Sequence, residues 1–308
     1  MNLTFEKAID NYLQYVKLKD KPQSHLKIKS RINNHILPFV KGKNIYDFKA
    51  VDYLEWQMQI NEMSLKYSYR KTLHYCFVAF LNFCIKFYDL KENVASKVGN
   101  FKNIDIECEG KSWTLEEFNQ FISCVDNIIY HALFNFLFFS GCRMGETLAL
   151  TFNDIIDSTI NINKTITKEY YCGKRITTLP KTKKSIRMIS IDSLLKNEIE
   201  QLREYYSTHY TDFNNNFYIF GGNKPLAPTT ITRKKNQYCR MANVPQIKIH
   251  EFRHSHACLL FQNNVPIEDI SKRLGHSSIT MTMNVYLRNI PRNEKRVIDT
   301  LNSLRLAP

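Results

Sequence analysis

The sequence lacks the features of a secreted, membrane-spanning or zinc-ribbon protein. Its eight cysteines are scattered without a single C-x-x-C pair, a pattern that argues against zinc ribbons and offers no disulfide framework. No uninterrupted apolar run approaches the roughly 20 residues that a membrane-spanning helix needs. The first residues, MNLTFEKAIDNY, carry Glu6 and Asp10 where a secretory signal would have an apolar block. We therefore expect a cytoplasmic protein without a membrane partner.

The first third of the chain is expected to form a helical domain. The 308 residues are enough for about two domains of roughly 150 residues each. In residues 1–103, apolar residues recur at helical spacing in four segments, which begin near Phe5, at Ser24, near 50 and near 65. The second of these helices is expected to run to Ile36 and to be stopped by Pro38. The periodicity is then lost, and we place a linker at 104–112.

Residues 113–290 are expected to form a second, mixed domain. Thr114 and Glu117 have the spacing of a capping box at a helix start, and the apolar run HALFNFLFFS predicts a buried helix that Gly141 ends. Over 159–191 the pattern changes to short alternating segments, which favours a small antiparallel sheet. Helical patterns return after 221. The predicted fold is therefore mainly α with a small antiparallel β-sheet, in two domains.

The charge balance points to a polyanionic partner. Lys and Arg number 43 against 29 Asp and Glu, a formal net charge of +14. Segments 170–191 and 221–250 contain several bases and no acid. Basic segments without nearby acids, inside a folded chain, favour a surface that faces phosphates. The alternative is a basic surface that has no function. The candidate DNA contacts are Lys183, Lys184, Arg233, Lys234 and Lys235.

The stretch HEFRH, from His250 to His254, fits the zinc metalloprotease pattern H-E-x-x-H. Two features argue against a zinc site: Arg253 is a poor neighbour for a dication, and no third ligand is obvious. His250 and Arg253 are three residues apart and so share one helical face, as do Arg143 and Glu146 in the stretch CRMGE. An arginine placed beneath an apolar core needs an anionic partner. That partner is either Glu146 alone or an anionic substrate.

Five motifs together resemble the tyrosine recombinases, the integrases of phages and transposons. They are SGCRMGE, the expected hairpin PKTKKS, HEFRHSHA, RLGHSSIT and TMNVY, in this order and spacing. The likeness extends over residues 3 to 290, and the stretch TFEKAIDNYLQY…NNHILPFV resembles the family's helical, SAM-like core-binding domain. The resemblance implies a DNA-clamping domain at 1–103 and a catalytic domain at 113–290. Many members also carry an arm-binding domain before the helical one, and the sequence leaves open whether this protein has one.

The resemblance also assigns roles within the second domain. Glu146 matches the acidic residue that supports the first catalytic arginine. The catalytic set that the likeness implies is Arg143, Lys181, His250, Arg253, His276 and the nucleophile Tyr286.

These residue types suit phosphodiester transfer without a metal or cofactor. Two planar guanidiniums bind the non-bridging oxygens as negative charge grows on them. A phenol with a pKa of about 10 needs neighbouring cations and a base before it attacks. A lysine in reach of the leaving 5′-oxygen supplies its proton. The product is a 3′-phosphotyrosine, which keeps the energy of the broken bond for rejoining.

The expected function is therefore site-specific DNA recombination that integrates or excises a mobile element. A Xer-like recombinase that resolves chromosome dimers and a type IB topoisomerase-like nicking enzyme are the alternatives. The expected partner is double-stranded DNA, with a homotetramer formed on it through the tail 291–308, which docks on a neighbouring protomer as such tails do in this family. A tail packed on its own domain is the alternative. An excisionase or a host DNA-bending protein is a further expected partner, and the location is the bacterial nucleoid.

Overall fold

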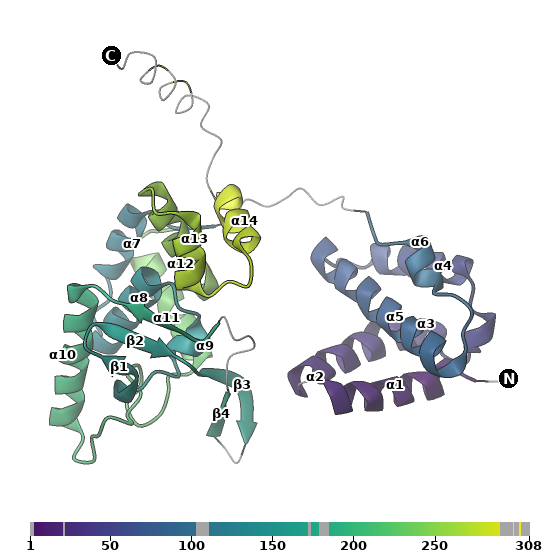
Figure 1. The fold of residues 1–308 in the computed structure, drawn as a ribbon, viewed down its shortest axis with the longest axis horizontal. Coiled ribbons are helices and arrows are strands. Elements are labelled where there is room, and N and C mark those ends of the chain that lie inside the picture. The colour runs from purple at the N-terminus through teal and green to yellow at the C-terminus, as the bar shows by residue number, and fades with distance from the viewer. Residues whose placement is uncertain are drawn as a thin grey trace. The chain divides into compact units, whose positions relative to one another are not determined.

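The chain forms two compact units in a computed structural model, which describes residues 3–20, 22–102, 111–171, 174–178, 185–289, 298 and 302. The first unit spans Met1–Glu107 and the second spans Cys108–Pro308. The first is helical, and the second combines helices with two small antiparallel sheets (Figure 1). The mainly helical fold with a small antiparallel part is therefore confirmed. Among the described helices, none is long and apolar enough to span a bilayer.

The N-terminal unit is a helical bundle around an aromatic core. Its main helices are α1 (Phe5–Lys19), α2 (Pro22–Arg31), α3 (Leu37–Val40), α4 (Ala50–Glu62), α5 (Tyr67–Tyr88) and α6 (Val94–Val98), with a 3-10 turn η2 (Ile45–Asp47) between α3 and α4. Trp56 and Phe77 pack edge to face in the core, with ring centroids 5.0 Å apart. Aromatic pairs of this geometry add to the burial of apolar area, so the bundle is held chiefly by its interior.

The expected stop at Pro38 was wrong. The helical run begins at Pro22 and continues through a π-helical turn, η1 (Ile32–Ile36), into α3, where Pro38 occupies the first turn. A proline ring excludes the carbonyl four residues back from helical bonding. The chain accommodates this by widening the turn, because the N–H of Leu37 bonds to the carbonyl of Ile32, five residues back. The proline therefore redirects the helix without ending it.

The C-terminal unit surrounds a central buried helix. This helix, α8 (Ile128–Ser140), packs against α7 (Leu115–Ile122), α10 (Ser193–His209) and α12 (Ile249–Gln262). Phe134, Phe136 and Phe138 of α8 are fully buried, and Gly141 ends the helix with a positive φ of 67°. The Thr114–Glu117 capping box is present at the start of α7. The sequence therefore predicted the start of α7 and the end of α8 correctly.

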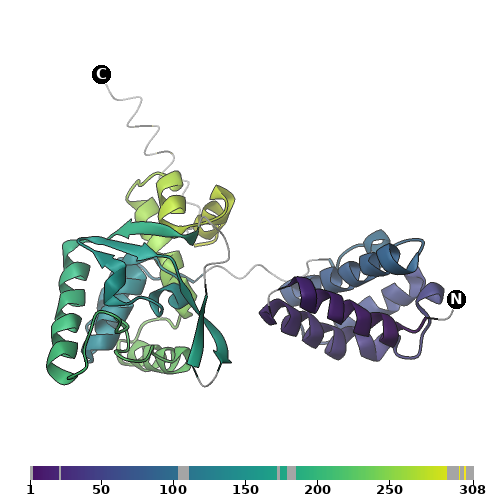
Figure 2. The ribbon, with the colours of Figure 1, turned by 60° about the horizontal axis from the view of Figure 1, so that its bottom comes forward.

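Two antiparallel sheets replace the single expected one. Strands β1 (Ile155–Ile156), β2 (Thr159–Ile162) and β5 (Arg187–Ser190) form one sheet in the order β1-β2-β5, while β3 (Thr165–Tyr171) pairs with β4 (Lys174–Thr178). The β3–β4 pair stands out from the body of the unit in both views (Figure 1, Figure 2). β4 and β5 flank the lysine segment 179–184 and belong to different sheets, so the strands before and after it do not pair with each other.

The remaining elements of the C-terminal unit carry most of the expected site. They are α9 (Met144–Thr147), the 3-10 turn η3 (Phe152–Asp154), α11 (Pro228–Met241), α13 (Ile267–Leu274) and α14 (Ile279–Asn289). α12, α13 and α14 pack on one another, and α9 packs against β3. Arg143, Arg253 and His276 are thereby brought together from distant parts of the sequence.

Candidate active site

Arg143 is fixed at the start of the short helix α9 by Glu146. The backbone N–H of Arg143 donates to Oε2 of Glu146 at 3.0 Å, and its Nη1 donates to Oε1 at 2.8 Å. Glu146 is 3% exposed, whereas the Arg143 side chain keeps 34% of its surface exposed. The carboxylate thus orients the guanidinium and leaves part of it open to a substrate.

Two glycines permit the close packing around Arg143. A Cβ at Gly141 would lie 2.5 Å from the His256 ring and 2.7 Å from a Leu274 methyl group. A Cβ at Gly145 would lie 2.6 Å from the Thr165 hydroxyl and 3.0 Å from a β3 carbonyl. Real side chains do not tolerate such distances, and the positive φ of Gly141 also disfavours other residues. The glycines of SGCRMGE therefore allow the chain before α9 to lie close to α12 and α13, and α9 itself to pack on β3.

Arg253 lies deeper, on α12, and is 2% exposed. Its Nη1 donates to the Gly141 carbonyl at 2.8 Å and its Nη2 to the Leu274 carbonyl at 2.6 Å. Burial, followed by the neighbouring charge of Arg143, lowers the pKa of Arg253 to about 9. The guanidinium remains charged at neutral pH, and the site holds three guanidiniums, those of Arg143, Arg187 and Arg253, against the carboxylate of Glu146.

Three successive carbonyls at the end of α13 accept hydrogen bonds from three arginines. Arg187 Nε donates to the Arg273 carbonyl at 2.7 Å, Arg253 Nη2 to that of Leu274 at 2.6 Å, and Arg143 Nη2 to that of Gly275 at 3.4 Å. The last carbonyls of a helix have no partner within the helix and carry partial negative charge. The end of α13 thus gathers and orients the guanidiniums.

Three histidines lie beside the arginines. His250 and His254 of α12 meet edge to face, with ring centroids 4.8 Å apart. Burial within the cluster, followed by the charges of its histidine and arginine neighbours, lowers the pKa of His250 to about 4, although part of the residue remains exposed. Burial, followed by Arg253 and Arg143, lowers the pKa of His276 to about 3. Both imidazoles are therefore neutral at pH 7 and able to accept a proton or a hydrogen bond.

α14 connects the histidine cluster to the expected nucleophile. The Nδ1 atom of His276 and the hydroxyl of the buried Thr282 are 2.7 Å apart. Tyr286 lies in the same helix, one turn after Thr282. The backbone of Tyr286 thus belongs to an element that is tied directly to His276. Lys181, Lys183 and Lys184 lie outside the described residues.

The expected DNA contact Lys235 needs correction. Its side chain is 2% exposed, and its ammonium donates to the carbonyl of Ile247. Lys235 therefore stabilises the loop before α12 from the inside, because its place on α11 faces the core. Arg233 is exposed on the same helix and Lys234 is partly exposed, so both remain accessible.

The H-E-x-x-H stretch forms part of the arginine cluster. Its two histidines face each other on α12, with Arg253 between them in sequence. In the part of the chain that the structure describes, no group of three His, Cys, Asp or Glu side chains is placed to hold a metal ion.

Arg187 belongs to this site, although the sequence analysis did not single it out. Its Nη2 donates to Oε2 of Glu146 at 3.0 Å. A signal was present in the alternation of the strand R-M-I-S, because Arg187 and Ile189 share one face and Ile189 is buried. A basic residue on the inward face of a strand needs a buried acid, and Glu146 is that acid.

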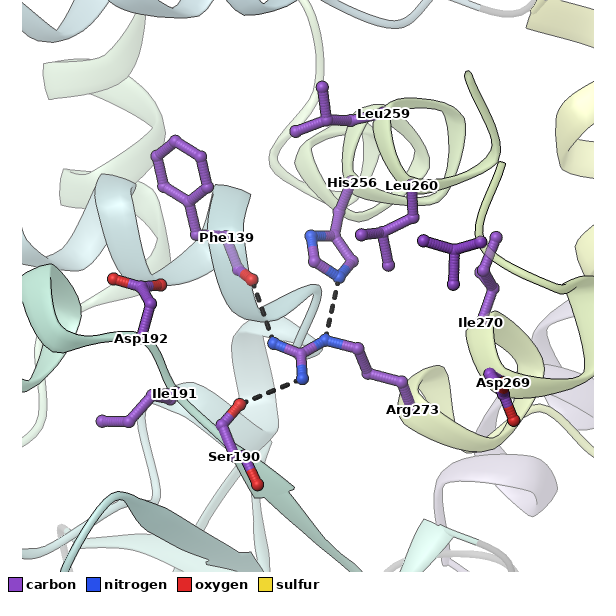
Figure 3. Close-up of a pocket in the computed structure, with 11 residues that line it drawn as sticks. Phe139, Ser190, Ile191, Asp192, His256, Leu259, Leu260, Asp269, Ile270 and Arg273 are labelled. Carbon is purple, nitrogen blue, oxygen red and sulfur yellow. Dashed lines mark hydrogen bonds between the residues drawn. The ribbon is translucent and has the colours of Figure 1, made fainter. Parts of the chain in front are cut away.

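A second arginine centre lies beside the site and uses none of the six expected catalytic residues. Arg273 donates to Nε2 of the buried His256 at 3.1 Å, to the Ser190 carbonyl at 3.0 Å and to the Phe139 carbonyl at 3.2 Å (Figure 3). It thereby joins α13 to α12, β5 and the end of α8. Leu259, Leu260 and Ile270 add an apolar wall to the adjoining pocket. His256 therefore has a structural role here.

The chain is similar to known proteins over both of its units. Residues 111–292 match the phage integrase family, and residues 4–61 match the phage integrase N-terminal SAM-like domain. The chain is 28% identical over 313 residues to the ICEBs1 integrase of Bacillus subtilis, covering 98% of this chain and 84% of that protein.

Two solved structures have a similar fold. The Tn1549 transposon integrase in complex with transposon right end DNA matches with a TM-score of 0.77 and 18% identity over the full length of both chains. A lambda integrase tetramer bound to a Holliday junction matches with a TM-score of 0.69 and 15% identity, covering 96% of this chain and 81% of that one.

Proposed function

The chain belongs to the phage integrase family, and from that premise we propose how its residues divide the work of cutting and rejoining DNA. It is a site-specific recombinase of the tyrosine type that acts in the integration of a mobile element. The proposal rests mainly on one observation: Arg143 and Arg187 both bind the carboxylate of Glu146, and the positive charge of these two arginines helps to lower the pKa of the nearby Arg253. A phosphodiester would supply the missing negative charge.

In the proposed reaction the hydroxyl of Tyr286 attacks the phosphorus atom of one DNA strand. Arg143 and Arg253 stabilise the charge that develops on the non-bridging oxygens. His250, neutral at pH 7, accepts the phenol proton or a phosphate hydrogen bond, and His276 assists from its position beside Thr282. Lys181 protonates the departing 5′-oxygen. The bond from phosphorus to the 5′-oxygen breaks as the phosphotyrosine bond forms, and a 5′-hydroxyl of another strand reverses the step.

We propose that the two units divide recognition from chemistry. Unit 1 grips the DNA as a core-binding domain, and the second unit supplies the catalytic residues. Arg233 and Lys234 on α11, together with Lys183 and Lys184, contact phosphates. The protein works as a homotetramer on its DNA site, joined by the tail 291–308, in the cytoplasm at the nucleoid and with an excisionase or a DNA-bending protein as helper. The lambda integrase neighbour, which is itself a tetramer on a Holliday junction, supports this assembly.

A trapping experiment tests the central assignment. A nicked half-site loses a short strand after cleavage, so the phosphotyrosine persists and is detected as a covalent protein–DNA band. Tyr286→Phe is expected to bind this DNA normally and to give no covalent product, because only the hydroxyl is removed. Tyr210→Phe, an exposed tyrosine of the same unit, serves as the control and should give the wild-type amount. Peptide mapping that finds DNA on another tyrosine would refute the assignment.

A further inference from the structure

Arg187 makes more hydrogen bonds than either arginine expected from the sequence. Its Nε donates to the Arg273 carbonyl at 2.7 Å, its Nη1 to the Ser185 carbonyl at 3.1 Å and its Nη2 to Oε2 of Glu146 at 3.0 Å. The side chain is 7% exposed, against 34% for Arg143. All three nitrogens of the guanidinium therefore already bind the protein, which makes Arg187 unsuited to contact a substrate.

The two oxygens of Glu146 are shared between two arginines. Oε1 accepts from the Nη1 of Arg143, while Oε2 accepts from the backbone N–H of Arg143 and from Arg187. Arg187 thus determines where the carboxylate lies, and the carboxylate determines where Arg143 points. We infer that Arg187 is a positioning residue for the recombination reaction, one that holds Glu146 so that Arg143 presents its free N–H groups to the scissile phosphate.

The electrostatics of Glu146 agree with this role. Burial by itself would raise the pKa of this carboxyl, but the charge and hydrogen bond of Arg187, followed by those of Arg143, outweigh burial and lower it. Without Arg187, a buried carboxylate would keep Arg143 as its only cationic partner. It would then draw the guanidinium inward, away from the exposed position in which it meets DNA.

Arg187 also ties this pair to the rest of the site. It stands at the start of β5, three residues after the end of the lysine segment 179–184, and it bonds to the first of the three α13 carbonyls. A lysine would not replace it fully, because a single ammonium does not match the planar fork that reaches Glu146, Ser185 and Arg273 together. The positioning role therefore predicts that a lysine at position 187 slows cleavage less than an uncharged side chain does.

The inference rests on the proposed function, and cleavage kinetics test the two separately. In single-turnover cleavage of the nicked half-site, Arg187→Met is expected to be slower than wild type by about 10²-fold, the cost of a misplacement near 1 Å. The cleavage rate of Arg187→Lys should fall between those of Arg187→Met and wild type. Because Arg187 acts through Arg143, the double variant Arg143→Ala with Arg187→Met should be no slower than Arg143→Ala alone.

A substrate with a methylphosphonate at the scissile position separates positioning from folding. A folding defect would slow the variant equally on both substrates. The methyl group removes the negative charge that Arg143 would stabilise, so the rate difference between Arg187→Met and wild type should shrink along with that of Arg143→Ala. Arg203→Met is the control, because Arg203 also pairs with an acid, Glu200, but on the surface. It should cleave both substrates at the wild-type rate.

The outcomes separate the two hypotheses. If Arg143→Ala cleaves the ordinary substrate normally, the proposed function is wrong. If Arg143→Ala is slow while Arg187→Met is as fast as wild type, Arg187 has no positioning role. Multiplied defects in the double variant, or an Arg187→Met defect that is equally large on methylphosphonate, would also overturn the inference and make Arg187 a residue of general folding.

Discussion

The two units of this chain build their interiors differently. The core of the N-terminal unit is aromatic and aliphatic, and its buried polar residues are Arg70 and His74 among those that the structure describes there. The C-terminal unit has an equally apolar core around α8 but also buries Glu146, Arg253 and His256. Glu146 lies on α9, and both Arg253 and His256 lie on α12.

This difference shows that the C-terminal unit buries both an acidic and a basic side chain, although their desolvation is unfavourable. Removing ionic groups from water is unfavourable unless they find close partners. In the C-terminal unit the partners are helix-end carbonyls and one carboxylate, and the excess charge is positive. Under the proposed division of work, the N-terminal unit grips DNA and needs only a stable shape, whereas the C-terminal unit also needs cations held in place before the substrate arrives. The following changes test this contrast.

The largest effect in this comparison is expected for Lys181, which the proposal places in the chemistry of the C-terminal unit. Lys181→Ala should slow cleavage by roughly 10²–10⁴, the usual contribution of one general acid. DNA binding should barely change, because one of many cationic contacts is lost. Quenched-flow cleavage of the nicked half-site gives the rate.

A 5′-bridging sulfur substrate isolates the role of the lysine. Sulfur leaves without a proton, so Lys181→Ala should cleave this substrate about as fast as wild type, while Arg143→Ala stays slow on both. Lys183→Ala is the neighbouring control and should show little defect on either. Equal defects of Lys181→Ala on oxygen and sulfur would remove it from the acid role and leave it as a phosphate contact.

The second effect concerns the apolar interior of the N-terminal unit. Phe77→Ala should lower the unfolding free energy of this unit by about 3–5 kcal/mol, because it removes a fully buried ring that packs on Trp56. The chain has two tryptophans, and each unit holds one of them, Trp56 and Trp113. Urea unfolding in a Trp113→Phe background, read by Trp56 fluorescence, measures this unit alone.

The matched control is Leu18→Ala, since Leu18 is 88% exposed and its loss leaves no cavity. Its unfolding free energy should stay within about 0.5 kcal/mol of the parent protein. Phe77→Ala should leave the transition seen by Trp113 in place. A shift of similar size in both transitions would show that the two units unfold together.

The smallest effect is a pH dependence confined to the C-terminal unit. Burial, followed by the charge of Arg273, lowers the pKa of His256 to about 3, while the unfolded chain has a histidine pKa near 6.5. The contribution of His256 to the free energy of unfolding is therefore complete above pH 6.5. It is lost as pH falls toward 3, because in this range only the unfolded chain takes up the proton. His256→Gln keeps an acceptor for Arg273 and should reduce this slope by up to about 1.4 kcal/mol per pH unit.

Urea unfolding in a Trp56→Phe background at pH 7, 6 and 5 measures this slope through Trp113. The informative quantity is the difference in pH slope of the unfolding free energy between His256→Gln and its parent. The carboxylates contribute equally to the slope of both proteins. Parallel pH profiles for the two proteins would mean that His256 is not held neutral in the folded state.

The sequence predicted those features that depend on local chemistry. The Thr114–Glu117 cap, the end of α8 at Gly141 and the start of α4 follow from neighbours within a few residues. The grouping of Arg143, Arg253 and His276 was expected from the family likeness and not from any spacing, because they lie far apart in sequence. Their proximity in the structure depends on the packing of α9, α12 and α13.

What the sequence did not predict depends on long-range geometry. Lys235 lies in a basic run but faces the core, because the register of α11 against the loop before α12 decides its direction. Arg187 was counted only as part of a basic segment, since its acid partner lies 41 residues earlier. The split into two sheets likewise depends on which distant strand β5 pairs with. A pattern read along the chain contains none of these distances.

The two glycines beside Arg143 limit how this enzyme could be re-engineered. Redirecting a recombinase to a new DNA site calls for libraries of variants, and most positions on a DNA-facing surface accept many residues. Gly141 and Gly145 accept almost none, because a single added carbon would meet His256 and Leu274 in one case and Thr165 in the other. Libraries that leave SGCRMGE intact and vary the exposed side of α11, where the proposed function places phosphate contacts, should therefore retain far more active members than libraries of equal size that include positions 141 and 145.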